Sequence, residues 1–222
     1  MVIDQIIQPD LILLGLRIQD PVNVLTDIIL GLVSMYAYYQ LKISENRANN
    51  LMKYYFLVFG WGAILGGVVG HAFIYYLDNH WRIFGWSLTL ISVLILQFAA
   101  VDYAKLSLKP LAVNLISALI FIEFTVVTAL TINFVDFIYV TIHSTFGIIL
   151  IFSPLHIITY LKTKNSGAKY MIFSVLVLIS TLLVYKIPIV IDPYFNHKDL
   201  AHMIICISIL LMLKGSKEYA RK

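Results

Sequence analysis

Apolar stretches alternate with short polar segments along this chain, and seven of these stretches are long enough to form a membrane-spanning helix. A helix needs about 20 predominantly apolar residues to cross the hydrocarbon core of a bilayer. The pattern predicts helices over residues 20–41, 51–77, 81–103, 110–132, 134–161, 168–185 and 197–213. We therefore expect an all-α fold in which residues 1–222 form one polytopic domain, a seven-transmembrane-helix bundle.

The two ends of the chain differ from the predicted helices. Residues 1–19 are apolar enough to lie along the membrane surface as a short interfacial helix, and residues 214–222 form a basic tail. The first twenty residues hold three aspartates against one cation, Arg17. A secretory signal peptide begins with a basic region, so we expect no cleaved leader.

Composition supports the membrane prediction. The chain is 60% hydrophobic and 13% charged, whereas about 25% of the residues in a soluble domain are charged. Lipid is therefore the expected solvent, and we predict an integral, multi-pass protein of the cell or inner membrane. Cys206 is the single cysteine, so neither an internal disulfide nor a cysteine-based metal site is expected.

Basic residues gather on one side of the predicted membrane. Twelve Lys and Arg residues belong to one set of loops and the tail, and four belong to the other side. The positive-inside rule then places the carboxyl terminus in the cytoplasm and the amino terminus outside. Because this bias accounts for most of the net charge of +4, we expect no nucleic-acid partner.

Acidic and imidazole side chains at membrane depth are costly, and they usually mark function. The predicted topology brings such groups from four helices into one layer near the outer face, with one more acid at mid-depth. The layer contains Asp20, Asn23, Asp27, His71, His143, His197, Asp199 and His202, and the deeper acid is Glu123. This convergence predicts a functional site near the outer leaflet.

Imidazoles and carboxylates suit a divalent metal, zinc in particular. An open coordination position would let that metal activate water at neutral pH. Asp27 is a candidate ligand or catalytic base. Asp199 and His202 are spaced i, i+3, so they share a helix face and are candidates to act together.

Structural roles remain open for several of these residues. His143 could be an interhelical hydrogen-bond donor, and Glu123 could be bonded to a neighbouring helix. Asp20 and Asn23 could cap the first helix, because both side chains accept hydrogen bonds from free N–H groups. Gly62, Gly66 and Gly70 recur every four residues, which favours close packing within the bundle or in a homodimer.

Three short motifs are similar to those of a known family. Asp20-x-x-Asn23-x-x-Thr26 resembles an acid–Asn–Ser pattern, Gly67-x-x-x-His71 resembles Ser-x-x-x-His, and His197 with His202 resembles a histidine pair in the last helix. In these motifs and in its topology the chain resembles the CREST superfamily, which includes the alkaline ceramidases and the progestin/adiponectin receptors.

The resemblance implies a ceramidase-like, zinc-dependent hydrolase that acts on a lipid amide or a related bond. His71, His202 and His197 would be zinc ligands, and Asp27 would replace a carboxylate for which Asp78 is the nearest counterpart by position. Besides this missing carboxylate, the chain departs from the pattern at two further places. Gly67 stands where the family has serine, and Lys198 stands where it has the first histidine of the pair.

Two functions follow as hypotheses. The first is an intramembrane hydrolase with Asp27 and Asp199 as catalytic residues, whose amphipathic lipid substrate arrives from the outer leaflet. The alternative is a non-enzymatic seven-helix receptor, or a membrane protein that binds a lipid or another small molecule. A proton-coupled carrier is less favoured, because no inverted repeat is visible in the sequence.

Overall fold

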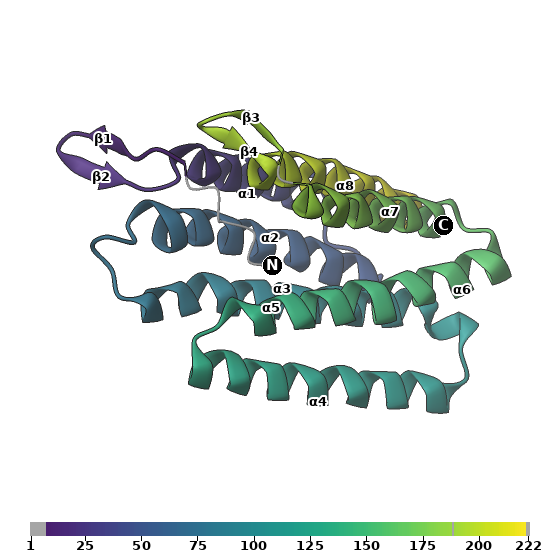
Figure 1. Ribbon diagram of the computed structural model, residues 1–222. Helices are drawn as coiled ribbons and strands as arrows, with labels where there is room; N and C mark the ends of the chain where they lie inside the picture. The colour runs from purple at the N-terminus through teal and green to yellow at the C-terminus, as the bar shows by residue number, and fades with distance from the viewer. Residues whose placement is uncertain (1–7, 188, 221–222) are drawn as a thin grey trace.

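The computed structural model describes residues 8–187 and 189–220, and helices dominate it (Figure 1). In this part of the chain, seven helical segments are long and apolar enough to cross a membrane, as predicted. They are Pro21–Gln40, Arg47–Ala72, Asn79–Ser107, Pro110–Phe134, Phe137–Thr163, Ser166–Val184 and His197–Ala220. Residues 1–7 of the predicted interfacial segment and residues 221–222 of the predicted tail lie outside the described residues.

Several of the spans are built from more than one helical element. The α-helices are α1 (Pro21–Gln40), α2 (Arg47–Gly67), α3 (Arg82–Ala104), α4 (Pro110–Phe134), α5 (Phe137–Thr145), α6 (Ser153–Thr163), α7 (Ser166–Lys186) and α8 (His197–Ala220). Two π-helices, η1 (Val68–Ala72) and η4 (Phe146–Phe152), continue α2 and α5. The 3₁₀ turns η2 (Asn79–Trp81) and η3 (Lys105–Ser107) flank α3.

Two predicted helix boundaries were wrong. The second span ends at Ala72 instead of residue 77, because η1 closes it and a turn follows. The last span continues to Ala220, so the described part of the basic tail is helical. Lys217 on this extension donates a hydrogen bond to Gln40 at the end of α1, in an exposed contact between the two helices.

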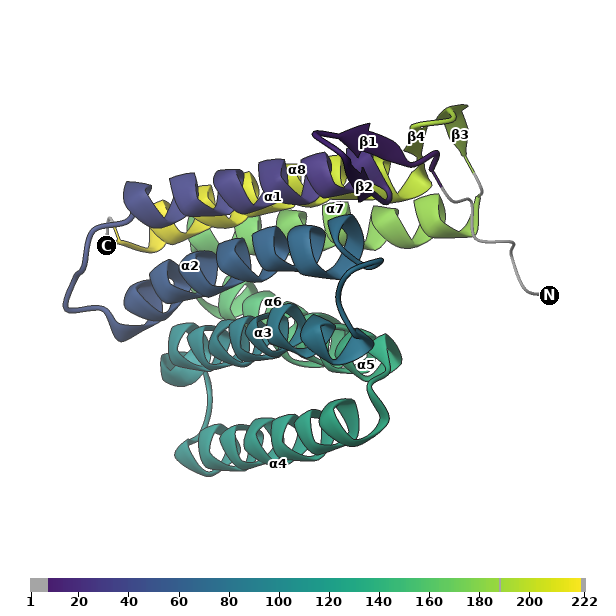
Figure 2. The same cartoon turned by 90° about the vertical axis from the view of Figure 1, so that its left-hand side faces the viewer.

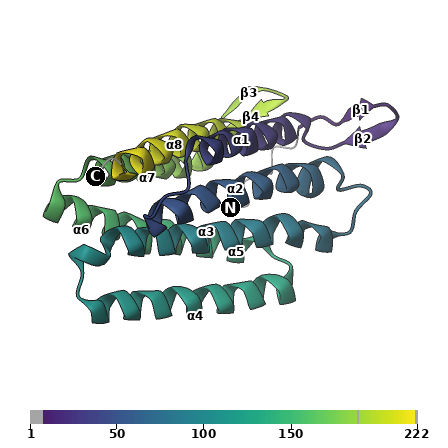
Figure 3. The ribbon, with the colours of Figure 1, turned by 180° about the vertical axis from the view of Figure 1, so that it is seen from behind.

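Six of the spans form a closed ring, and α4 lies outside it. Around the ring α1 contacts α2, α2 contacts α3, α3 contacts α6, α6 contacts α7, α7 contacts α8, and α8 returns to α1. The helix α4 packs mainly against α3 and α5, at the edge of the molecule (Figures 2 and 3). Its outer face is a row of exposed apolar side chains, which suits contact with lipid.

Two β-hairpins mark one end of the bundle, which we call the hairpin end. They pair β1 (Leu11–Leu13) with β2 (Leu16–Ile18) and β3 (Val190–Asp192) with β4 (Phe195–Asn196), opposite the end where α8 finishes (Figure 2). The first hairpin corrects the predicted interfacial helix within residues 8–19. Leu14 and Gly15 both have positive φ, as a type I′ turn requires, and Leu14 is 96% exposed.

Glycines bring α1 and α2 into backbone contact. A Cβ atom on Gly31 would lie 2.5 Å from Cγ1 of Ile64 and 2.8 Å from the carbonyl oxygen of Gly60. A Cβ atom on Gly60 would lie 3.0 Å from the carbonyl oxygen of Gly31. The crossing with α1 therefore uses Gly60, which is not part of the predicted row. Of that row, Gly62 lies against Leu88 and Thr89 of α3, whereas a Cβ atom at Gly66 or Gly70 would meet nothing within 4 Å.

Replacing Gly31 with alanine tests this crossing. Overpacking of a tight contact typically costs about 1–3 kcal/mol, so the free energy of unfolding should fall by that amount. Gly66→Ala is the matched control, because a Cβ atom at Gly66 meets nothing within 4 Å. The unfolding of both variants in detergent micelles would be compared with that of the parent, and an unchanged stability of Gly31→Ala would contradict the packing described here.

Candidate functional site

A cavity of about 540 Å³ lies at the hairpin end, among α1, α2, η1, α3, α5 and α8. One part of its wall is apolar and aromatic, and includes Leu30, Phe59, Ile74, Trp86, Phe137 and Ile205. The other part is polar and is formed by Gln19, Asp20, Asn23, Asp27, His71, Arg82, Thr89, Lys198 and His202. The cavity is therefore amphipathic, with five of the residues predicted from the sequence on its polar wall.

His71 forms the first of two acid–histidine pairs on this wall. It lies in the π-helix η1, an irregularity that is frequent at functional sites. Its Nδ1 is 3.5 Å from Oδ2 of Asp20, and the amide nitrogen of Asn23 lies 3.4 Å from both ring nitrogens. Burial raises the pKa of Asp20, but the hydrogen bonds from His71 and from the backbone N–H of Gln8 outweigh it and hold that pKa below its ordinary value.

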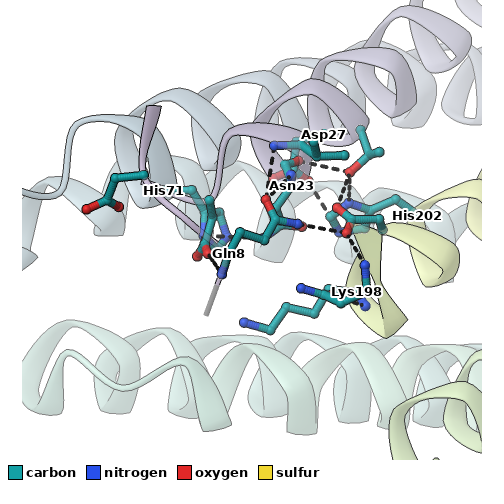
Figure 4. A network of polar contacts seen from close by, with 12 residues as sticks. Gln8, Asn23, Asp27, His71, Lys198 and His202 are labelled. Carbon is teal, nitrogen blue, oxygen red and sulfur yellow. Dashed lines mark hydrogen bonds and ion pairs between the residues drawn. The ribbon is translucent and has the colours of Figure 1, made fainter. Parts of the chain in front are cut away.

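His202 and Asp27 form the second pair, between α8 and α1 (Figure 4). Nε2 of His202 is 3.4 Å from Oδ1 of Asp27, and Nδ1 is 2.9 Å from the hydroxyl oxygen of Thr26. The Thr26 contact fixes the orientation of the ring, so that Nε2 faces the carboxylate. Asp27 reaches this place because Gly67 leaves room for it, since a Cβ atom at position 67 would lie 2.7 Å from Cβ of Asp27.

Asp199 lies in the first turn of α8, at the depth predicted for it, but behind the cavity wall. It is fully buried and is not among the residues that line the cavity. Its Oδ2 accepts hydrogen bonds from the side-chain amide of Gln8 and from the backbone N–H of Asn196, both at 2.8 Å, and Thr26 donates to Oδ1 at 3.3 Å. Three donors therefore hold this carboxylate, which makes it a structural link between α8, α1 and the segment before β1.

Gln8 also caps α1, a role predicted for Asp20 or Asn23. Asp20 occupies the N-cap position in a left-handed conformation, and its side chain makes no capping hydrogen bond. Instead, Oε1 of Gln8 accepts from the backbone N–H groups of Val22 at 3.0 Å and Asn23 at 3.2 Å. One glutamine side chain thus satisfies the free donors of α1 and a buried acid of α8.

Glu123 and His143 form a separate pair between α4 and α5. Oε2 of Glu123 is 2.7 Å from Nδ1 of His143, and Nε2 of His143 is 3.1 Å from the carbonyl oxygen of Leu90. The structure thus places His143 in the interhelical contact that was one of its two expected roles. His197 is buried near the start of α8 but does not line the cavity, and Asp78 is exposed beside His80.

The two pairs meet only part of the requirement for a zinc site. A separation of 3.4 Å between Nε2 of His202 and Oδ1 of Asp27 suits two ligands of one ion, and the hydroxyl contact on Nδ1 is the kind of support that metal-binding histidines have. Within the described residues, no three His, Cys, Asp or Glu side chains gather closely enough to hold a metal ion. The arrangement therefore falls short of the three protein ligands of a catalytic zinc site.

A comparison with protein-family models gives one match, to a family of unknown function, DUF6962, over residues 22–221. The chain belongs to the DUF6962 family. The region that matches the family contains both histidines of the cavity and Asp27, whereas Gln8 and Asp20 precede it. No curated protein and no solved structure matches the chain.

Sequence reasoning missed three residues that shape the site. Gln8 carried no signal, because it lies in a segment predicted to be peripheral. Arg82 was counted only among the four cations on the outer side of the membrane, although it lines the cavity from the start of α3. Thr26 was noted only as part of a motif, and the structure gives its hydroxyl contacts with both Asp199 and His202.

Replacing Gln8 with alanine should destabilise the protein by about 2 kcal/mol, because it removes a helix cap and one donor to a buried carboxylate. Gln40→Ala is the control, since Gln40 is exposed and its contact with Lys217 is at the surface. Thermal unfolding in micelles would compare the two. Equal midpoints for both variants would rule out the capping role of Gln8.

Proposed function

We propose that this protein is a multi-pass membrane protein that binds an amphipathic small molecule, such as a single-chain lipid, in the cavity at the hairpin end. The observation that carries the proposal is that both apolar or aromatic side chains and polar side chains line the cavity. A ligand with a hydrocarbon chain and a polar head would match both. Small-molecule sites of about 300–1,000 Å³ typically combine an apolar lining with a few oriented polar groups.

The charge distribution supports one orientation in the membrane. Among the described residues, the loops and helix ends opposite the hairpin end hold ten Lys and Arg residues, and Arg221 and Lys222 follow Ala220 in the sequence. The positive-inside rule then places the hairpin end outside and the carboxyl terminus in the cytoplasm. The cavity would face the outer leaflet, from which a lipid could enter.

Filling the cavity tests the binding proposal. Gly66 lines it, and a Cβ atom there meets no other atom within 4 Å, so Gly66→Leu should place its side chain in the empty space. Lipids that copurify with the protein would be measured by mass spectrometry, and we expect the variant to lose the bound amphiphile. Ala118→Leu adds similar bulk on the exposed face of α4 and should retain it. Equal lipid content in both variants would contradict the proposal.

A second candidate function is the hydrolase that the CREST-like motifs imply. The observation in its favour is the fixed ring of His202, with Nε2 directed at Asp27. A zinc ion at this pair would need a further ligand, for which His71 on the same cavity wall and His197 near the start of α8 are the candidates from the sequence. Such an enzyme would cleave an amide or a related bond of the same kind of amphiphile.

Metal analysis separates the two candidates. If the protein is a zinc hydrolase, chelator-free preparations should contain about one zinc per chain, and His71→Ala and His202→Ala should each lose most of it. His80→Ala is the control, because His80 is an exposed loop residue. Protein without zinc that still retains a bound amphiphile would support binding alone.

A further inference from the structure

Two cations on the wall of the cavity have no counter-ion among the described residues. Arg82 begins α3 and Lys198 lies in the first turn of α8, and both line the cavity. In the described part of the chain, neither side chain makes a salt bridge or a hydrogen bond, and the buried Nε of Arg82 has no hydrogen-bond partner there.

The acids nearby already have partners. Asp20 contacts His71 and the backbone N–H of Gln8, and Asp27 contacts His202. Asp199 accepts hydrogen bonds from three donors and lies outside the cavity wall. Lys198 acts on Asp20 through space and does not form an ion pair with it. The carboxylates are therefore engaged, and the two cations are available to a ligand.

The placement of these cations suits an anion. A positive charge that is partly withdrawn from water is costly unless it is paired. A guanidinium group presents a planar fork of donors that matches phosphate or carboxylate, and an ammonium group adds a compact charge. Both residues also lie at the amino ends of their helices, where the helix dipole favours negative charge.

We infer that the cavity selects an amphiphile with an anionic head group, a phosphate, sulfate or carboxylate, bound between Arg82 and Lys198. The hydrocarbon chain would lie against the apolar wall that includes Phe59, Trp86 and Ile205. This inference rests on the proposed binding function and specifies the class of ligand.

Three amphiphiles that share one chain and differ in head group test the inference: hexadecyl phosphate, neutral hexadecyl glycerol and hexadecyltrimethylammonium. Binding to the full chain in nonionic micelles would be measured by native mass spectrometry. Charged hydrogen bonds are worth about 1.5–3 kcal/mol, so the phosphate should bind at least about ten times more tightly than the neutral compound. The cationic compound should bind most weakly.

Variants assign this preference to the two side chains. Arg82→Gln and Lys198→Gln should each lower the affinity for hexadecyl phosphate about tenfold and leave that for hexadecyl glycerol nearly unchanged. Arg82→Lys and Lys198→Arg keep the charge and should retain much of the preference. Lys109→Gln, at the opposite end of the bundle, is the control for general attraction to anions.

The outcomes distinguish the inference from the binding function on which it rests. Equal affinity for all three amphiphiles would overturn the head-group inference and leave amphiphile binding intact. No binding of any of them would overturn both. Displacement of hexadecyl phosphate by an equal concentration of inorganic phosphate would show a site for small anions and would also overturn the inference.

Discussion

The close crossing of α1 and α2 is the contact on which the site depends. Backbone meets backbone at Gly31 and Gly60, and nearer the hairpin end Asp27 fills the space above Gly67. Because α1 also packs against α8, this approach places one carboxylate of α1 beside both α2 and His202. A side chain at position 67 would displace Asp27 and separate it from the histidine.

The same crossing accounts for one departure from the CREST-like pattern. That pattern has a serine where this chain has Gly67, and the volume that a serine side chain would need is occupied by Asp27. The glycine at position 67 and the position of Asp27 are therefore linked. The carboxylate of Asp27 from α1 occupies the place that the resemblance would give to a serine hydroxyl group from α2. Thr26 supplies a hydroxyl from α1 instead, and it contacts His202. The polar wall therefore has its own arrangement, in which α1 provides Asn23, Asp27 and the supporting hydroxyl group of Thr26.

Bilayer thickness made the fold predictable, because the length of an apolar run is a local property of the sequence. The depth of each polar side chain in the membrane followed from the predicted topology. The grouping of Asp27, His71 and His202 at one end of the bundle could therefore also be predicted. Which helices lie next to each other in the bundle could not be predicted, because the apolar face of a span does not specify its neighbours. His143 was therefore assigned to the same layer, although it pairs with Glu123 beside α4. The position of Gln8 depends on long-range contacts that a sequence pattern does not record.

The fixed charges of the cavity bear on the choice between the two proposed functions. A divalent ion at His202 and Asp27 would share the cavity with Arg82 and Lys198, and like charges repel strongly where water is scarce. Lys198 stands where the CREST-like pattern places a histidine, so a potential ligand is exchanged for a permanent cation. An anionic head group would be stabilised by the same two side chains that disfavour a metal ion. The charges and the lining of the cavity therefore favour the proposed binding of an anionic amphiphile over the proposed zinc chemistry.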